Sequence, residues 1–188
     1  MPQDLDLNTI FNLTDTVDTA KTVIVPVPWD LTTTYHHGTA GAPVSIQTAS
    51  AQLDLTHPWK GQVWQDGIAM SEFPDQLYKL NQRLRPLATQ LVSRMDNLDT
   101  DGLATINLAC QEMVDHVYQE TAGYLSQNKY IVLLGGEHGV GLGFYRALKE
   151  RFGSFGILQV DAHMDLRNAY LGMTYSHASC MYNALETY

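Results

Sequence analysis

Asp161, His163 and Asp165 stand at alternate positions of one short segment, and His138 ends a second segment, residues 135–138 (G-G-E-H). Alternate side chains of an extended chain point the same way, so we expect the first three to converge. Two carboxylates and two imidazoles form a donor set that suits Mn²⁺, Fe²⁺, Ni²⁺ or Zn²⁺ better than Ca²⁺ or Mg²⁺. Because a carboxylate can bridge two cations, the set allows a site for two divalent metal ions.

Both segments follow apolar runs that are typical of buried strands. These runs are residues 130–134 (Y-I-V-L-L) and 156–160 (G-I-L-Q-V), and between them residues 141–152 predict a helix that Gly153 ends. Strand, helix and strand in succession predict a βαβ unit with parallel strands in a sheet covered on both faces. Ligands bind beyond the carboxyl ends of such strands, where these polar segments lie.

The rest of the chain predicts further elements of an α/β fold. The β-branched run at residues 22–27 indicates a strand, and residues 62–68 are a second candidate. Helices are expected at residues 44–53, 76–94, 105–127 and 178–187. Pro86 is expected to kink or divide the second of these helices.

Composition excludes several classes of protein. The chain has 188 residues, with 20 acidic and 11 basic side chains and a net charge of −9, which argues against a nucleic-acid-binding surface. No apolar run is long enough for a membrane span, the acidic N-terminus is unlike a secretory signal, and 2 cysteines are too few for a disulfide scaffold. We expect a single cytoplasmic domain, residues 1–188, with residues 1–20 as a loose arm.

A rival motif overlaps the predicted metal segments. Gly139, Gly141 and Gly143 follow a predicted strand and open a helix, as in a dinucleotide-binding fingerprint. The fingerprint G-x-G-x-x-G requires glycine at position 144, where this chain has Phe144. The glycines are therefore expected to allow close packing of the helix on the sheet.

Three further residues near these segments have two interpretations each. His177 precedes the last predicted helix and is either a proton shuttle or an ordinary loop histidine. Glu137 is either a metal ligand or a partner that orients His138. Arg167 either balances the carboxylates or is simply exposed.

With its segments in this order, the chain resembles the ureohydrolase superfamily of arginases, agmatinases and formimidoylglutamases. The resemblance rests on G-G-E-H at 135–138, D-A-H-M-D at 161–165 and a weaker match at residues 28–46, which begins P-W-D. Residues 165–179 are most similar to agmatinase-like members. The resemblance implies a three-layer α/β/α sandwich around a mostly parallel sheet, as in the arginase and deacetylase folds.

The resemblance also implies a site and an activity. His138, Asp161 and Asp165 would hold one ion, and Asp161 and His163 the other, with Mn²⁺ the common metal and Ni²⁺, Fe²⁺ or Zn²⁺ as alternatives. His177 matches a loop histidine implicated in proton transfer. The implied reaction is hydrolysis of a guanidinium C–N bond by a metal-bridging hydroxide, converting agmatine or a related small guanidino substrate to an amine and urea. This places the protein in polyamine metabolism, as a homo-oligomer when full length.

One family segment, S-x-D-x-D-x-x-D-P, has no counterpart before Tyr188. The resemblance therefore implies an N-terminal portion that lacks the last strands and two aspartate ligands and is inactive alone. One alternative is a non-catalytic homologue that associates with a full-length subunit. Another is a metal-dependent amide or amidine hydrolase of the same fold. The sequence leaves the substrate open among agmatine, arginine, guanidine and formimidoylglutamate.

Overall fold

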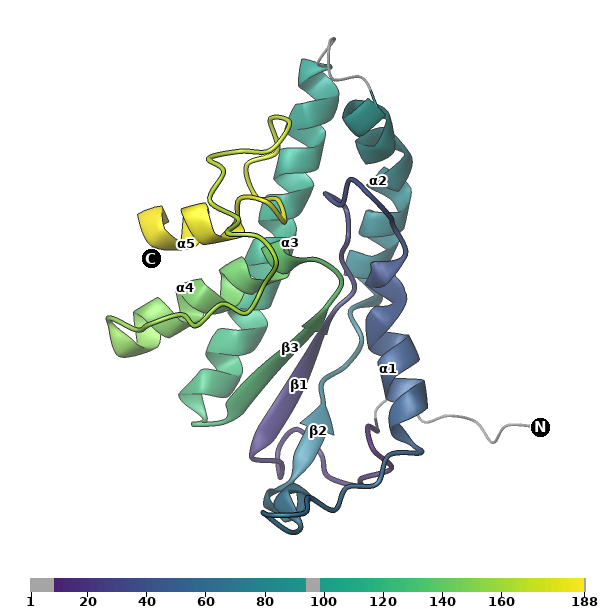
Figure 1. Ribbon diagram of the computed structural model, residues 1–188, viewed down its shortest axis with the longest axis vertical. Helices are drawn as coiled ribbons and strands as arrows, with labels where there is room; N and C mark the ends of the chain where they lie inside the picture. Colours follow the sequence, from purple (N-terminus) through teal and green to yellow (C-terminus); the bar gives the residue numbers. More distant parts are fainter. Residues whose placement is uncertain (1–8, 94–98, 188) are drawn as a thin grey trace, which may run out of the picture.

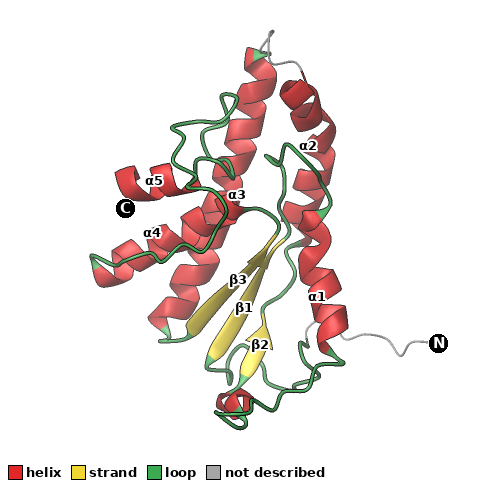
Figure 2. Cartoon of the chain, in the orientation of Figure 1, coloured by secondary structure: helices red, strands yellow, loops and turns green. Residues whose placement is uncertain are grey.

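The computed structural model describes residues 9–93 and 99–187 and shows an α/β fold built on one parallel sheet. Its strands are β1 (Thr22–Val27), β2 (Ile68–Met70) and β3 (Tyr130–Gly135), in the order β2-β1-β3 (Figures 1 and 2). Thr22 of β1 lies opposite both Ile68 and Tyr130. The strands predicted at residues 22–27 and 130–134 are confirmed.

Helices cover this sheet, and all four helices predicted outside residues 130–160 are present with shifted ends. The helices are α1 (Ala42–Ser50), α2 (Asp75–Ser93), α3 (Thr100–Ser126), α4 (Gly141–Phe152) and α5 (Cys180–Thr187). The helix α3 begins before the expected residue 105, because Asp99 accepts a hydrogen bond from the Gly102 N–H and caps it. Among the described residues, no helix combines the length and apolar character that crossing a membrane requires.

Alternate residues of β1 face two separate apolar clusters, which makes the three layers of the fold. Val23, Val25 and Val27 lie in the main core with side chains of α2, α3 and α4. Ile24 faces the other way and packs with Ile10 and Met70. Residues 9–13 thus cover the second face, where the Phe11 N–H donates to Ser50 Oγ of α1. Part of the arm predicted to be loose is therefore packed, and residues 1–8 lie outside the described residues.

Two local predictions are wrong. Residues 62–68 do not form a strand: Val63–Asp66 is a 3₁₀ turn, and strand β2 begins only at Ile68. Pro86 does not divide α2, which is continuous around it, and of the two expected effects only a kink stays a prediction. Proline costs a helix one backbone hydrogen bond, but Leu84, Leu87 and Ala88 pack into the main core on the same turns and offset that loss.

A larger correction concerns residues 156–160. They are not a strand and do not pair with β3. Instead they run back from the end of α4 as an irregular segment (Figure 1). Leu158 and Val160 are 91% and 94% exposed. A strand needs a neighbour for its backbone hydrogen bonds and its apolar side chains, and no described segment provides one here. The predicted βαβ unit is therefore absent from the described structure.

The helices α3 and α4 touch backbone to backbone at Gly143, so this glycine allows close packing as expected, but the partner is a helix and not the sheet. A Cβ atom on Gly143 would lie 2.4 Å from the carbonyl oxygen of Val114 and 2.6 Å from the nitrogen of Tyr118. Both atoms belong to the backbone of α3, so neither can move aside alone. Glycine is thus required for this helix contact.

Gly143→Ala is expected to lower the free energy of unfolding by about 1–3 kcal/mol, because the added methyl group forces α4 away from α3. Gly123→Ala is the matched control: it also lies in a helix, but a Cβ there meets nothing within 4 Å. That variant should stabilise the protein by about 0.5–1 kcal/mol. Urea unfolding curves measure both, and equal effects would contradict the contact.

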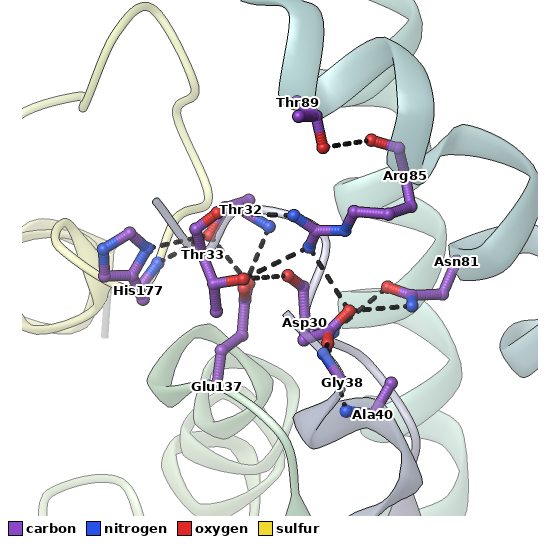
Figure 3. Close-up of polar contacts among 10 residues, drawn as sticks. All are labelled: Asp30, Thr32, Thr33, Gly38, Ala40, Asn81, Arg85, Thr89, Glu137 and His177. Atoms are coloured by element: carbon purple, nitrogen blue, oxygen red, sulfur yellow. Dashed lines mark hydrogen bonds and ion pairs between the residues drawn. The ribbon is translucent and has the colours of Figure 1, made fainter. Parts of the chain in front are cut away.

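The loop after β1 is fixed by the buried carboxylate of Asp30 (Figure 3). Its Oδ2 accepts hydrogen bonds from the backbone N–H groups of Gly38 (2.6 Å) and Ala40 (3.2 Å). Its Oδ1 accepts from Asn81 Nδ2 (2.9 Å) and pairs with Arg85 at 3.2 Å, both on α2. One carboxylate therefore joins the start of this loop, its end and a helix.

This network determines how the Asp30 carboxyl titrates. Burial raises its pKa, but the hydrogen bonds from Asn81, Gly38 and Ala40 and the charge of Arg85 outweigh burial, so the pKa is lowered from its ordinary value of 3.8. A lowered pKa in the folded state means that the ionised carboxylate stabilises the protein above about pH 4. That contribution disappears as the pH falls through the folded-state pKa.

Asp30→Asn is expected to lower the free energy of unfolding by about 3–5 kcal/mol at neutral pH, because it leaves Arg85 unpaired and replaces one acceptor with a donor. The difference from the wild type should shrink below about pH 4. Asp66→Asn is the control, since Asp66 pairs with Lys21 at 3.5 Å with 73% of its side chain exposed. It should cost less than about 1 kcal/mol. Urea unfolding at several pH values separates the two.

Candidate metal centre

The first part of the candidate site is the turn that follows β3. A Cβ atom on Gly136 would lie 2.5 Å from the carbonyl oxygen of Trp29, so the turn packs directly against the loop after β1. The chain then enters a short 3₁₀ turn, His138–Val140, that leads into α4. This places the imidazole of His138 beyond the carboxyl end of β3, as the sequence predicts.

The structure brings three of the four predicted metal ligands together. His138 Nδ1 lies 2.6 Å from Asp165 Oδ2 and 3.5 Å from Asp161 Oδ2. One donor atom from each of these residues lies within 4.8 Å of the other two. The set offers one nitrogen and two carboxylates to a single point.

His163, the fourth predicted ligand, stands apart from this cluster. Its side chain is 82% exposed, and its Nδ1 lies 3.8 Å from Asp161 Oδ1. The reason is that residues 161–163 bend and Asp165 has a φ of 52°, so the segment is not extended. The expected alternation is therefore wrong, although Asp161 and Asp165 still meet at His138.

Local hydrogen bonding prepares Asp161 to bind a cation. The backbone N–H of His163 donates to Asp161 Oδ1 at 2.8 Å. This bond is the main reason that the pKa of Asp161 is lowered, and the neighbouring imidazoles act in the same direction. Asp161 is thus ionised at neutral pH.

His177 and Asp165 both line a cleft beside the cluster. Burial lowers its pKa, an effect that the nearby Asp165 opposes. The imidazole is therefore neutral at neutral pH and able to accept a proton. Its backbone N–H donates to Thr32 Oγ1 at 3.0 Å, and its Nδ1 lies 3.1 Å from the same oxygen (Figure 3).

Glu137 contacts Thr32 rather than His138. Its Oε2 accepts from the Thr32 N–H and its Oε1 from the Thr32 hydroxyl, both at 2.9 Å. Burial raises the pKa of Glu137 to about 8, against the two bonds from Thr32 and the charge of Arg85. Neither interpretation that the sequence offered for Glu137 matches these contacts.

A cleft of about 900 Å³ opens beside His177 and Asp165. One wall comes from Thr33–His36, which follow the Asp30 network, and the other from residues 163–178. Arg167 lines this cleft with its guanidinium 5.0 Å from the ring centre of Tyr170, whose edge meets the His177 ring at 5.6 Å. Arg167 therefore does not pair with the carboxylates.

Sequence reasoning missed Thr32 in the loop after β1, and it placed His36 in a loop that could line a site without any spacing to assign it a role. Thr32 holds both Glu137 and His177, and His36 lines the cleft. The weak P-W-D match at Pro28–Asp30 was the one signal for this loop, and spacing alone did not connect it to residues more than a hundred positions away.

The donor set fits a divalent metal ion. A mixed nitrogen and carboxylate set of this kind suits Mn²⁺ and its first-row neighbours. One nitrogen of His138 and one carboxylate oxygen each of Asp161 and Asp165 lie close enough together to reach a single cation. His163 would join a second position only if its exposed ring turned toward Asp161.

Comparison with known proteins identifies relatives of this chain. A sequence model described as the Arginase family matches residues 20–188. The N(1)-aminopropylagmatine ureohydrolase of Synechocystis sp. is 29% identical over 169 residues, which cover 89% of this chain and 47% of that protein. An enzyme of the same name from Thermus thermophilus is 27% identical over 177 residues, which cover 94% of this chain and 51% of that protein.

A solved structure extends the comparison to the fold. The agmatine ureohydrolase of Thermoplasma volcanium superimposes with a TM-score of 0.68 at 25% identity, covering 95% of this chain and 50% of that one. The chain thus spans about half the length of the relatives it matches. The family model matches nearly the whole chain, and so this protein belongs to the Arginase family.

Proposed function

We propose that this chain carries part of the centre of a two-metal hydrolase that cleaves a guanidinium C–N bond and releases urea. The observation that carries the proposal is the convergence of His138, Asp161 and Asp165, the last of which lines a cleft together with His177. Membership of the Arginase family supports the same reaction class.

In this proposal, bound Mn²⁺ ions supply hydroxide near neutral pH by lowering the pKa of a shared water. The residues of the chain do the rest. His138, Asp161 and Asp165 hold one ion, and Asp161 with a reoriented His163 contributes to the second. His177 is neutral and lies in the cleft, so it can carry a proton between the reacting groups and solvent.

The substrate that we propose is agmatine or a related linear guanidino compound. The names of the relatives above give N(1)-aminopropylagmatine and agmatine as their substrates. Each of these compounds carries a guanidino group on an amine chain. The cleft has an open, partly aromatic wall where Tyr170 lies next to His177. Such a wall can contact the methylene chain of a linear substrate.

A second candidate is a non-catalytic homologue that associates with a longer subunit. The exposed apolar side chains favour it: Tyr130 and Val132 of β3 are 64% and 48% exposed, and Leu158 and Val160, in the segment after α4, are 91% and 94% exposed. Contiguous exposed apolar surface marks interaction sites. The two candidates differ in whether the protein releases urea.

Urea release from agmatine in the presence of Mn²⁺ tests the proposed activity. We expect urea from the native protein as isolated from its source, and a loss of at least about a hundredfold in kcat for His177→Ala, as for loss of a proton-transfer group. Aminopropylagmatine and an acylated amine complete the substrate panel. Release of acetate without urea would favour an amide hydrolase, and no turnover of any substrate would favour the non-catalytic homologue.

Mn²⁺ binding tests the metal site separately from turnover. Asp165→Asn and His138→Ala should each weaken Mn²⁺ binding by more than about tenfold, because each removes a donor from the converging set. Asp115→Asn is the control, since Asp115 is an exposed carboxylate that pairs with Arg146 at 3.0 Å on α3 and α4. Paramagnetic resonance of free Mn²⁺ gives the affinities. Equal binding by the wild type and both ligand variants would overturn the site.

A further inference from the structure

Thr32 is fully buried, and its hydroxyl group is the point where two parts of the site meet. The oxygen Oγ1 lies 2.9 Å from Glu137 Oε1, 3.0 Å from the backbone nitrogen of His177 and 3.1 Å from His177 Nδ1 (Figure 3). One threonine side chain thus links a buried carboxyl group to the histidine in the cleft.

The number of hydrogens available for these bonds determines which ring nitrogen of His177 carries the proton. When the Glu137 carboxyl group is ionised, both of its oxygens only accept: one accepts from the Thr32 N–H and the other from the single hydroxyl hydrogen of Thr32. The hydroxyl oxygen is then left as an acceptor, and the backbone N–H of His177 uses one of its lone pairs. A hydrogen bond from Oγ1 to Nδ1 therefore requires that the proton lie on Nδ1.

We propose that Thr32 is a positioning residue that, with Glu137 ionised, holds neutral His177 with its proton on Nδ1, so that Nε2 is reserved for proton exchange in the cleft. The inference rests on the proposed function only in giving His177 the role of proton carrier. A fixed hydrogen bond on one ring nitrogen sets the tautomer and so decides which nitrogen can act as a base.

Other contacts hold this geometry in place. In the described part of the chain, Nε2 of His177 has no hydrogen-bond partner, while the edge of Tyr170 packs against the ring at 5.6 Å. Thr33, the next residue along the loop, donates from its N–H and its hydroxyl to the Asp30 carbonyl oxygen and accepts from Arg85. Thr32 is therefore anchored on both sides, by Glu137 and through Thr33 by the Asp30 network.

Nitrogen NMR of the protein labelled with ¹⁵N-histidine tests the proposal without any turnover. At about pH 9, above the pKa of about 8 that burial gives Glu137, the carboxyl group is ionised and His177 is neutral. We expect the wild-type His177 signal, assigned by its loss in His177→Ala, to show the Nδ1–H tautomer. A wild-type signal of the Nε2–H tautomer would overturn the proposal even if no Thr32 variant folds.

Two variants at one position provide the matched comparison. Thr32→Val keeps the branched shape but removes the hydroxyl, and should lower the Nδ1–H to Nε2–H ratio by about fivefold, the value of one ordinary hydrogen bond. Thr32→Ser keeps the hydroxyl and should retain the wild-type ratio. An unchanged ratio in Thr32→Val would overturn the proposal. Absence of urea release from the wild type would refute the proposed function and leave these tautomer ratios as they are.

Discussion

The buried carboxylate of Asp30 is the interaction on which the geometry of the cleft depends. Taking a carboxylate out of water is costly unless hydrogen bonds and an opposite charge replace the lost hydration, and Asp30 has four donors that do so. Two of those donors come from the far end of the loop that begins at Asp30, and the other two come from α2. Satisfying the charge therefore fixes the loop, and the fixed loop presents Thr32 to Glu137 and His177.

The elements of the fold that depend on local sequence patterns could be predicted. The apolar runs that became β1 and β3, the long periodic helix α3 and the close packing at Gly143 all follow from residue type and spacing. Residues 156–160 have an equally strong apolar pattern and are not a strand. A pattern indicates that a segment can pair, but pairing needs a neighbour, and its position is a property of the whole fold.

The candidate site divides in the same way. His138, Asp161 and Asp165 could be singled out because motifs place them just beyond apolar runs. The expectation that alternate side chains of residues 161–165 point the same way did not hold for His163. The chain bends at residues 161–163 and has a positive φ at Asp165, so this segment is not extended. The roles of Thr32 and Glu137 depend on contacts between residues about a hundred positions apart. No periodicity or spacing in a single sequence reports such contacts, whereas the resemblance to ureohydrolases at least drew attention to the loop that contains Thr32.

The topology of the sheet also has a consequence for how the chain folds during synthesis. Among the three described strands the central one, β1, comes first in the sequence, but its partners begin at Ile68 and Tyr130. Closing loops of this length costs entropy before any strand pairing repays it, and such distant pairings fold slowly. Val23 and Val25 must therefore stay exposed until most of the chain has been made. This interval gives chaperones, or neighbouring unfinished chains, their longest access to the segment that becomes the centre of the core.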